Sequence, residues 1–174
     1  NDGKGTGNHF GISKKIDVYI SSLSKGLGSF GGYIASQKNV IELCINNSKS
    51  FIYTSALPEL FVDDANKRFD SDRETKRKKL WKNVKIFSSE LKKIGYDLKS
   101  NSHIIPIIIG KEKTAMEFSS YLFKNGIYAQ AIRYPTVPYN KARIRMSITS
   151  RLTRKHITNI IDILEKAKRK FQIL

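Results

Sequence analysis

The chain has 174 residues, 40% of them hydrophobic, which suffices for one domain or for a large domain and a small one, and its single cysteine excludes an internal disulfide. Its longest apolar run, residues 104–109, is far shorter than the ~20 residues of a membrane-spanning helix, so we expect a cytoplasmic protein with no membrane partner. The net charge of +17 suggests an anionic partner, but the basic residues are spread along the chain without a nucleic-acid-binding motif.

The first part of the chain is expected to form a loop, two strands and a helix. Residues 1–16 are polar and glycine-rich, and short apolar runs predict strands at residues 17–21 and 31–35. A helix is expected over residues 37–46, with Ser36 as its cap. Its apolar positions, which we expect to be buried, are Val40, Ile41, Leu43, Cys44 and Ile45.

The second part of the chain predicts an α/β sandwich. Residues 58–94 are helical with a bend near residues 69–72, and Gly95 fits a helix stop. One face of this helix is marked by Leu80, Val84, Phe87 and Leu91. The remaining elements are a strand at 103–109, a helix at 113–124, strands at 128–133 and 143–149, and a helix at 153–171 capped by Thr153.

One lysine differs from the others in its surroundings. Lys25 has no charged residue within seven positions on either side and lies in the run SLSKGLG, residues 22–28. A P-loop needs Gly before the lysine and Ser or Thr after it, which excludes that motif here. An amine that attacks a carbonyl must be unprotonated, and few nearby cations favour that state. The spacing therefore fits a Schiff-base lysine or a plain polar turn.

Three separated motifs resemble a known family. The run SLSKGLG is similar to the cofactor-lysine signature of fold-type I pyridoxal-phosphate enzymes. The segments FIYTSALP (51–58) and AQAIRYPTVPYNKARIRMSIT (129–149) follow in the order of the C-terminal half of the α-oxoamine synthases. The resemblance is greatest to the branch that serves biotin synthesis, and glycine C-acetyltransferase and 5-aminolevulinate synthase are the alternatives within the family. A non-catalytic basic module that binds nucleic acid is the alternative from another class.

The resemblance implies a cofactor, pyridoxal 5′-phosphate, and residues that bind it. Lys25 matches the lysine that forms an imine with the cofactor and then acts as the base. Ser22 stands where the family usually has Thr, whose hydroxyl contacts the cofactor phosphate. Thr54 and Ser55 match the hydroxyls that reach the phosphate of the partner subunit, which implies a homodimer with shared active sites. The family's second proline after this pair is replaced by Glu59.

The resemblance also implies residues that bind the substrate. Arg145 aligns with the arginine that binds the substrate α-carboxylate, for which a guanidinium offers a bidentate grip. Arg143 lies two residues away on the same strand face, and alternation alone cannot choose between the two. Thr136 belongs to the loop that lines the substrate entrance in relatives. No metal site is expected, and nucleic acid is not an expected partner.

The implied reaction joins L-alanine to pimeloyl-CoA or to pimeloyl-carrier protein, with decarboxylation, to give 8-amino-7-oxononanoate. The implied fold is the C-terminal part of a fold-type I large domain, residues 1–65, followed by a small α/β C-terminal domain, residues 66–174. The family's aspartate that pairs with the pyridine nitrogen and its histidine that stacks on the ring precede the matched region. We therefore expect an incomplete fragment that is inactive alone.

Overall fold

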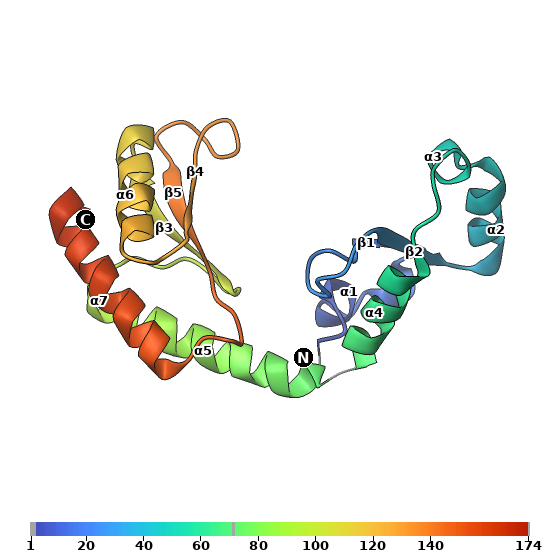
Figure 1. The fold of residues 1–174 in the computed structure, drawn as a ribbon, viewed down its shortest axis with the longest axis horizontal. Coiled ribbons are helices and arrows are strands. Elements are labelled where there is room, and N and C mark those ends of the chain that lie inside the picture. Colours follow the sequence, from blue (N-terminus) through green and yellow to red (C-terminus); the bar gives the residue numbers. More distant parts are fainter. Residues whose placement is uncertain (1–2, 71, 174) are drawn as a thin grey trace. The chain divides into compact units, whose positions relative to one another are not determined.

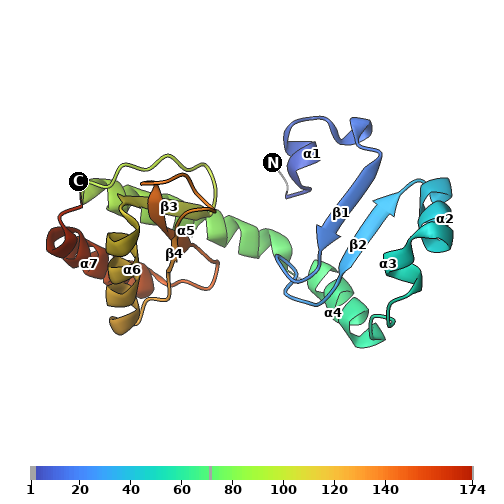
Figure 2. The same ribbon diagram turned by 90° about the horizontal axis from the view of Figure 1, so that it is seen from above.

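The computed structural model describes residues 3–70 and 72–173, and its backbone groups into two compact units, Asn1–Thr75 and Lys76–Leu174 (Figure 1). The first unit is built around a two-stranded antiparallel ribbon, in which β1 (Val18–Ser22) pairs with β2 (Gly32–Ser36) from Val18↔Ser36 to Ser22↔Gly32 (Figure 2). The helical elements around it are α1 (Thr6–His9), η1 (Ser13–Lys15), α2 (Lys38–Asn47), α3 (Lys49–Ile52) and α4 (Glu59–Asp70).

The apolar side chains of the first unit are largely exposed. Ile20 on β1 is 79% exposed, and in α2 none of the residues is buried. The expected buried face of α2 is therefore wrong within this unit, since Leu43 and Ile45 are 62% and 50% exposed. The helical spacing of apolar residues identifies the face that a partner would cover, but it does not place that partner in this chain.

The N-terminal cap of α2 also differs from the expectation. Gln37 occupies the cap position, without a side-chain hydrogen bond to the helix. The hydroxyl of Ser36 instead donates to the carbonyl of Asp17 at 2.6 Å. Ser36 therefore closes the open end of the β1–β2 ribbon, because its register partner Val18 follows Asp17 directly.

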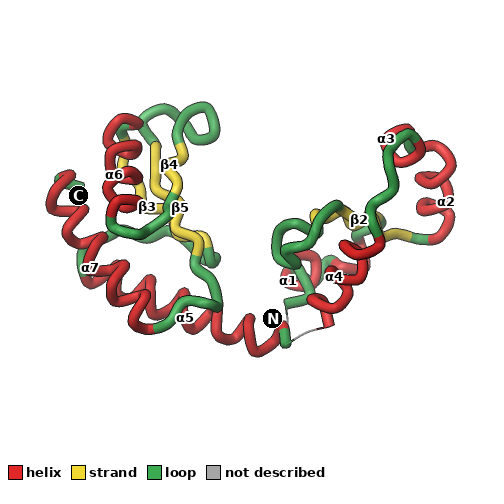
Figure 3. The backbone as a smooth tube through the Cα atoms, in the orientation of Figure 1, coloured by secondary structure: helices red, strands yellow, loops and turns green. Residues whose placement is uncertain are grey.

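The second unit is the expected α/β sandwich. It contains most of α5 (Arg73–Lys93), then β3 (Ile104–Gly110), α6 (Glu112–Lys124), β4 (Gln130–Ile132), β5 (Ala142–Ser147) and α7 (Arg154–Phe171) (Figure 3). The sheet order is β3-β5-β4, and β5 is antiparallel to both neighbours. β3 and β4 therefore run in the same direction, joined by α6, with β5 inserted between them in a split βαβ arrangement.

One hydrophobic core holds the second unit together. Alternation on β5 directs Ile144 and Met146 inward, and it leaves Arg143 and Arg145 on the outer face of the sheet. The predicted stripe of α5 is confirmed, since Val84, Phe87 and Leu91 are buried. Other core side chains come from the remaining strand and helices: Ile105, Ile107, Phe118, Leu122, Ile157, Ile161 and Leu164.

The predicted helix boundaries are largely confirmed. The expected bend separates α4, which ends at Asp70, from α5, which begins at Arg73. Gly95 adopts φ +81°, a conformation that ends helices and favours glycine. Thr153 caps α7 in a capping box with His156. The strand expected over residues 128–133 is shorter, because the ladder with β5 includes only Gln130–Ile132.

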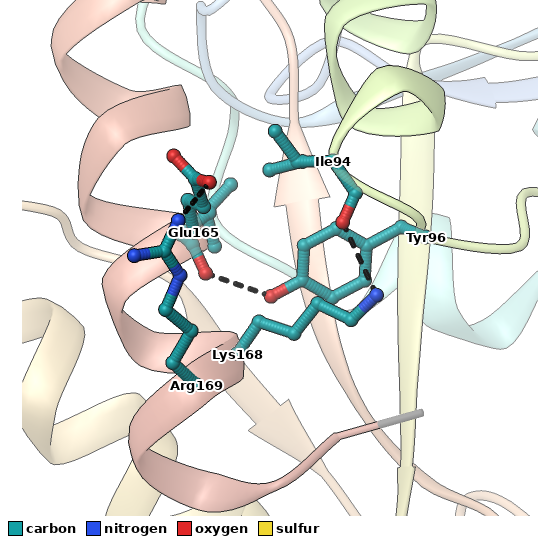
Figure 4. A network of polar contacts seen from close by, with 6 residues as sticks. Ile94, Tyr96, Glu165, Lys168 and Arg169 are labelled. Atoms are coloured by element: carbon teal, nitrogen blue, oxygen red, sulfur yellow. Dashed lines mark hydrogen bonds and ion pairs between the residues drawn. The ribbon is translucent and has the colours of Figure 1, made fainter.

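A polar network joins the end of α5 to α7 (Figure 4). The phenol of Tyr96, which is buried, donates to the carbonyl of Leu164 at 2.9 Å. The Nζ of Lys168 donates to the carbonyls of Ile94 and Gly95 at 3.1 and 2.7 Å. A lysine of the last helix thereby satisfies carbonyls just beyond the end of α5, groups that no intrahelical donor can reach.

The described residues contain neither a membrane-spanning helix nor a metal-binding cluster of side chains. None of the helices in the described ranges is long and apolar enough to cross a membrane. Among the same residues, the His, Cys, Asp and Glu side chains form no group of three that could hold a metal ion. The proposed division of the chain at residues 65 and 66 stays a prediction.

Candidate cofactor and substrate site

Lys25 lies on a structured connection between β1 and β2, residues 23–31, which we call the Lys25 turn. Leu23 is buried, its N–H donates to the carbonyl of Gly31 at 2.9 Å, and its carbonyl accepts from the N–H of Ser29 at 3.0 Å. The carbonyl of Lys25 accepts from the N–H of Gly28 at 3.1 Å. The side chain of Lys25 is exposed and has no hydrogen-bond or ion-pair partner among the described residues.

Glycines give the Lys25 turn its shape. Gly31 has φ +90°, and a Cβ there would lie 2.9 Å from Cδ2 of Leu57, so a larger residue would strain the backbone and clash. Gly26, next to the lysine, has open space where a side chain would stand. The turn therefore holds a fixed backbone while it leaves room beside the amine of Lys25.

A pair of hydroxyls stands beside the Lys25 turn. The Oγ atoms of Ser22 and Ser24 are 2.7 Å apart, and the N–H of Ser24 donates to the Oγ of Ser22 at 3.2 Å. Ser22 closes β1 and is half-buried. One hydroxyl of the pair donates to the other, so one hydroxyl proton is left to be donated to an anion.

Thr54 and Ser55 lie in the exposed segment after α3. The hydroxyl of Thr54 is 3.5 Å from the carbonyl of Ser55, which is a long and weak hydrogen bond. No hydrogen bond joins either residue to Ser22 or Lys25 within the described residues. Their hydroxyls are therefore exposed for contact with a group outside this unit.

The outer face of the small sheet distinguishes the two arginines that alternation left equivalent. The Nε of Arg143 donates to the carbonyl of Lys141 at 3.1 Å, and Arg143 is half-buried. Arg145 is exposed and makes no hydrogen bond or ion pair among the described residues. The register places Arg145 between Pro106 of β3 and Gln130 of β4.

The geometry brings some of the expected residues together within each unit. Ser22 and Lys25 share one turn, and Thr54 and Ser55 lie in the same unit. Arg145 and Thr136 belong to the second unit, where Thr136 forms a turn by donating its N–H to the carbonyl of Arg133 at 3.0 Å. Gln130 was not predicted as a neighbour of Arg145, because strand register cannot be read from a single sequence.

The donors of the first unit fit an aldehyde that carries a phosphate. Lys25 offers an amine free of ion pairs among the described residues, beside a glycine that leaves space for a ring. The hydrogen-bonded hydroxyl pair of Ser22 and Ser24 offers a donor for a phosphate oxygen. These are the groups that pyridoxal phosphate requires from a protein that binds it through a lysine.

The family model described as Aminotransferase class I and II matches residues 2–164. The chain belongs to this family. It is also similar to curated proteins named 8-amino-7-oxononanoate synthase. The identity is 38% for Thermoanaerobacter pseudethanolicus and 39% for Fervidobacterium nodosum, over 99% of this chain and 44% of each relative. For the Bacillus subtilis protein the identity is 34%, over 99% of this chain and 45% of the relative. The chain thus spans less than half the length of these curated relatives.

Solved structures show the same fold. A Sphingomonas wittichii serine palmitoyltransferase superposes with a TM-score of 0.92 at 24% identity, over 100% of this chain and 45% of that one. An 8-amino-7-oxononanoate synthase from Francisella tularensis superposes with a TM-score of 0.83 at 26% identity, over 99% of this chain and 52% of that one. The fold is therefore the C-terminal part of a fold-type I enzyme, and pyridoxal phosphate, the cofactor implied by the sequence motifs, is the cofactor of this group.

Proposed function

We propose that this chain is the part of an α-oxoamine synthase that carries the cofactor lysine and the carboxylate-binding arginine. The whole enzyme would condense L-alanine with pimeloyl-CoA or pimeloyl-carrier protein, with loss of carbon dioxide, to 8-amino-7-oxononanoate in biotin synthesis. The observation that carries this proposal is the 32–39% identity, along nearly the whole chain, to proteins named for that product. The isolation of Lys25 among small residues supports it independently.

Each residue of the proposed site has a defined task. Pyridoxal phosphate, when bound, supplies an electron sink for a carbanion at the amino acid α-carbon. The Nζ of Lys25 would hold the cofactor and would accept the α-proton of alanine as a general base. The hydroxyl of Ser22 would donate to the phosphate. Arg145 binds the alanine carboxylate, and because its grip is bidentate it also fixes which α-carbon bond faces the base. Thr136 contributes to the substrate entrance.

A homodimer with shared sites is part of this proposal. Thr54 and Ser55 would donate their hydroxyls to the phosphate bound in the partner subunit. The neighbouring surface has room for such an interface, because it exposes large apolar side chains that either the partner subunit or the rest of the enzyme would have to cover. These are Leu43, Phe51, Ile52 and Tyr53, which are 62%, 61%, 45% and 82% exposed.

Chemical trapping on the chain itself tests the role of Lys25. Pyridoxal phosphate is added, the lysine adducts are reduced with borohydride, and the labelled peptides are quantified by mass spectrometry. We expect Lys25 to be labelled above the other lysines, and Lys25→Ala to remove that excess. Lys15→Ala, which changes another exposed lysine of the same unit, should leave it intact. Equal labelling of all exposed lysines would contradict the assignment of Lys25.

Turnover tests the reaction and the need for the rest of the fold. Two proteins are compared: the chain alone, and the chain combined with the N-terminal part of a relative. Each is supplied with pyridoxal phosphate, a pimeloyl thioester and either alanine or glycine. We expect 8-amino-7-oxononanoate only from the combined protein and only with alanine. A preference for glycine would reassign the chain to another branch of the synthases, and turnover by the chain alone would contradict its incompleteness.

A further inference from the structure

A surface groove of about 520 Å³ lies in the second unit, and none of the residues that line it belongs to the proposed site. One wall is α5, and the other is the loop that leads from α5 to β3. The volume falls in the range of small-molecule sites, about 300–1,000 Å³. The residues that line the groove are Trp81, Val84, Lys85, Ser88, Ser89, Lys92, Ser100 and Asn101.

The helical wall carries an aromatic ring followed by two ammonium groups. Trp81, Lys85, Ser88 and Lys92 are spaced by four, three and four residues, so they lie along one face of α5. The helical rise places Lys85 about 6 Å and Lys92 about 16 Å along the axis from Trp81. Trp81 is 38% exposed, so part of its indole is accessible to a ligand.

The charge of the groove is positive and uncompensated. Lys85 and Lys92 make no hydrogen bond or ion pair among the described residues. The two nearest carboxylates in sequence bind other lysines: Glu90 accepts from Lys93 at 3.0 Å, and Asp97 lies 3.6 Å from Lys99. None of the residues that line the groove is acidic. An anion entering here would meet two unpaired cations.

The loop wall is fixed and offers a polar group to the groove. The hydroxyl of Ser100 donates to the carbonyl of Ile104 at 2.6 Å and accepts from the N–H of Ser102 at 3.2 Å. These bonds tie the loop to the start of β3. The carboxamide of Asn101 takes part in no hydrogen bond among the described residues, so it offers both a donor and an acceptor to a ligand.

We propose that this groove binds a phosphorylated nucleotide, with the base stacked on Trp81 and the phosphates between Lys85 and Lys92. An indole face favours a flat heteroaromatic ring, and two lysines farther along the same helix face favour phosphates at a nucleotide's distance from that ring. Asn101 and the serine hydroxyls can bind the sugar or the base edge. The proposal uses none of the residues assigned to the proposed synthase site.

The single tryptophan of the chain makes the proposal directly measurable. Trp81 fluorescence is recorded while ADP, adenosine or inorganic pyrophosphate is added to the chain at low ionic strength. We expect ADP to quench the emission saturably and adenosine to bind at least about tenfold more weakly. Pyrophosphate should compete with ADP while it quenches little, because it lacks the ring that contacts the indole.

Matched charge variants separate a site from general attraction to a basic protein. Lys85→Gln with Lys92→Gln should weaken ADP binding by at least about tenfold. Lys155→Gln with Lys166→Gln removes the same charge from exposed positions on α7 and should leave the affinity for ADP unchanged. Equal weakening in both pairs, quenching that does not saturate, or equal affinity for ADP and adenosine would overturn the proposal. Circular dichroism verifies that each variant is folded.

Discussion

The fold changes the protonation of Tyr96. Burial raises the pKa of its phenol, because the charged phenolate would lose its hydration. The neutral phenol donates to the carbonyl of Leu164, and the ammonium of Lys168 lies 5.4 Å from the centre of its ring (Figure 4). The folded chain thus holds the proton of Tyr96 more tightly than the unfolded chain does.

We predict that the stability contributed by Tyr96 is lost in alkaline solution. A raised pKa in the folded state stabilises the protein below the ordinary tyrosine pKa of about 10, and this contribution falls as pH rises beyond that value. Urea unfolding from neutral pH to about pH 11 should show a steeper loss in the wild type than in Tyr96→Phe. At neutral pH the variant should lose about 1 kcal/mol with its hydrogen bond. Tyr128→Phe, at an 85% exposed position, is the control and should match the wild type.

Asn83 is the buried polar side chain that joins α5 to the loop after β5. Its Nδ2 donates to the carbonyls of Thr149 and Leu152, both at 3.0 Å. Asn83→Ala would leave both carbonyls without this partner, and we expect a loss of about 2–3 kcal/mol in the free energy of unfolding. Asn159→Ala, at an exposed position on α7, should change it by less than about 0.5 kcal/mol. Equal effects in urea unfolding would contradict this role.

The start of α7 depends on one side-chain cap. The Oγ1 of Thr153 accepts from the N–H of His156 at 3.2 Å, and Nδ1 of His156 accepts from the N–H of Thr153 at 3.4 Å. We predict that Thr153→Ala lowers the free energy of unfolding by about 1 kcal/mol. The comparison variant is Thr158→Ala, within the same helix. Denaturant unfolding should show that it changes the free energy of unfolding by less than about 0.5 kcal/mol.

The inward-facing residues of α5 and β5 and the end of α5 were predicted correctly from the sequence. The periodic stripe and Gly95 predicted the core face and the end of α5, and alternation predicted the inward face of β5. The prediction that one face of α2 is buried was wrong, because no surface among the described residues of the first unit covers the apolar face of this helix. The predicted length of β4 was wrong. Only Gln130–Ile132 pair with β5, although β5 continues beyond both ends of this ladder, and the alternation within one strand does not show how many of its residues pair.

At the scale of the whole chain, the residues of the proposed site, which were predicted from motifs, divide between the two units. Lys25 and its hydroxyl neighbours belong to the first unit, and Arg145 belongs to the second. The sequence alone could not choose between Arg143 and Arg145, because both share a strand face. The structure adds that only Arg143 is held by a backbone carbonyl, which leaves Arg145 as the guanidinium available for the proposed carboxylate.

The two units should differ in local stability. The second unit has one continuous core that includes Phe87, Phe118 and Leu164, each fully buried, whereas the β1–β2 ribbon exposes Ile20 and Tyr33. Backbone hydrogen bonds that are not covered by buried side chains open more easily. We predict amide exchange in β1 and β2 at least about 100-fold faster than in β3 and β5, which corresponds to about 2.7 kcal/mol of opening free energy.

Hydrogen exchange read by mass spectrometry at several protein concentrations tests this difference and the proposed interface together. If a second copy covers the apolar surface around α2 and α3, protection there should rise with concentration by mass action, while β3 and β5 stay unchanged. Leu43→Ser with Phe51→Ser removes apolar area from that surface and should abolish the concentration dependence. Equal protection in both units at every concentration would contradict the difference in stability, and a rise that persists in the double variant would contradict the interface.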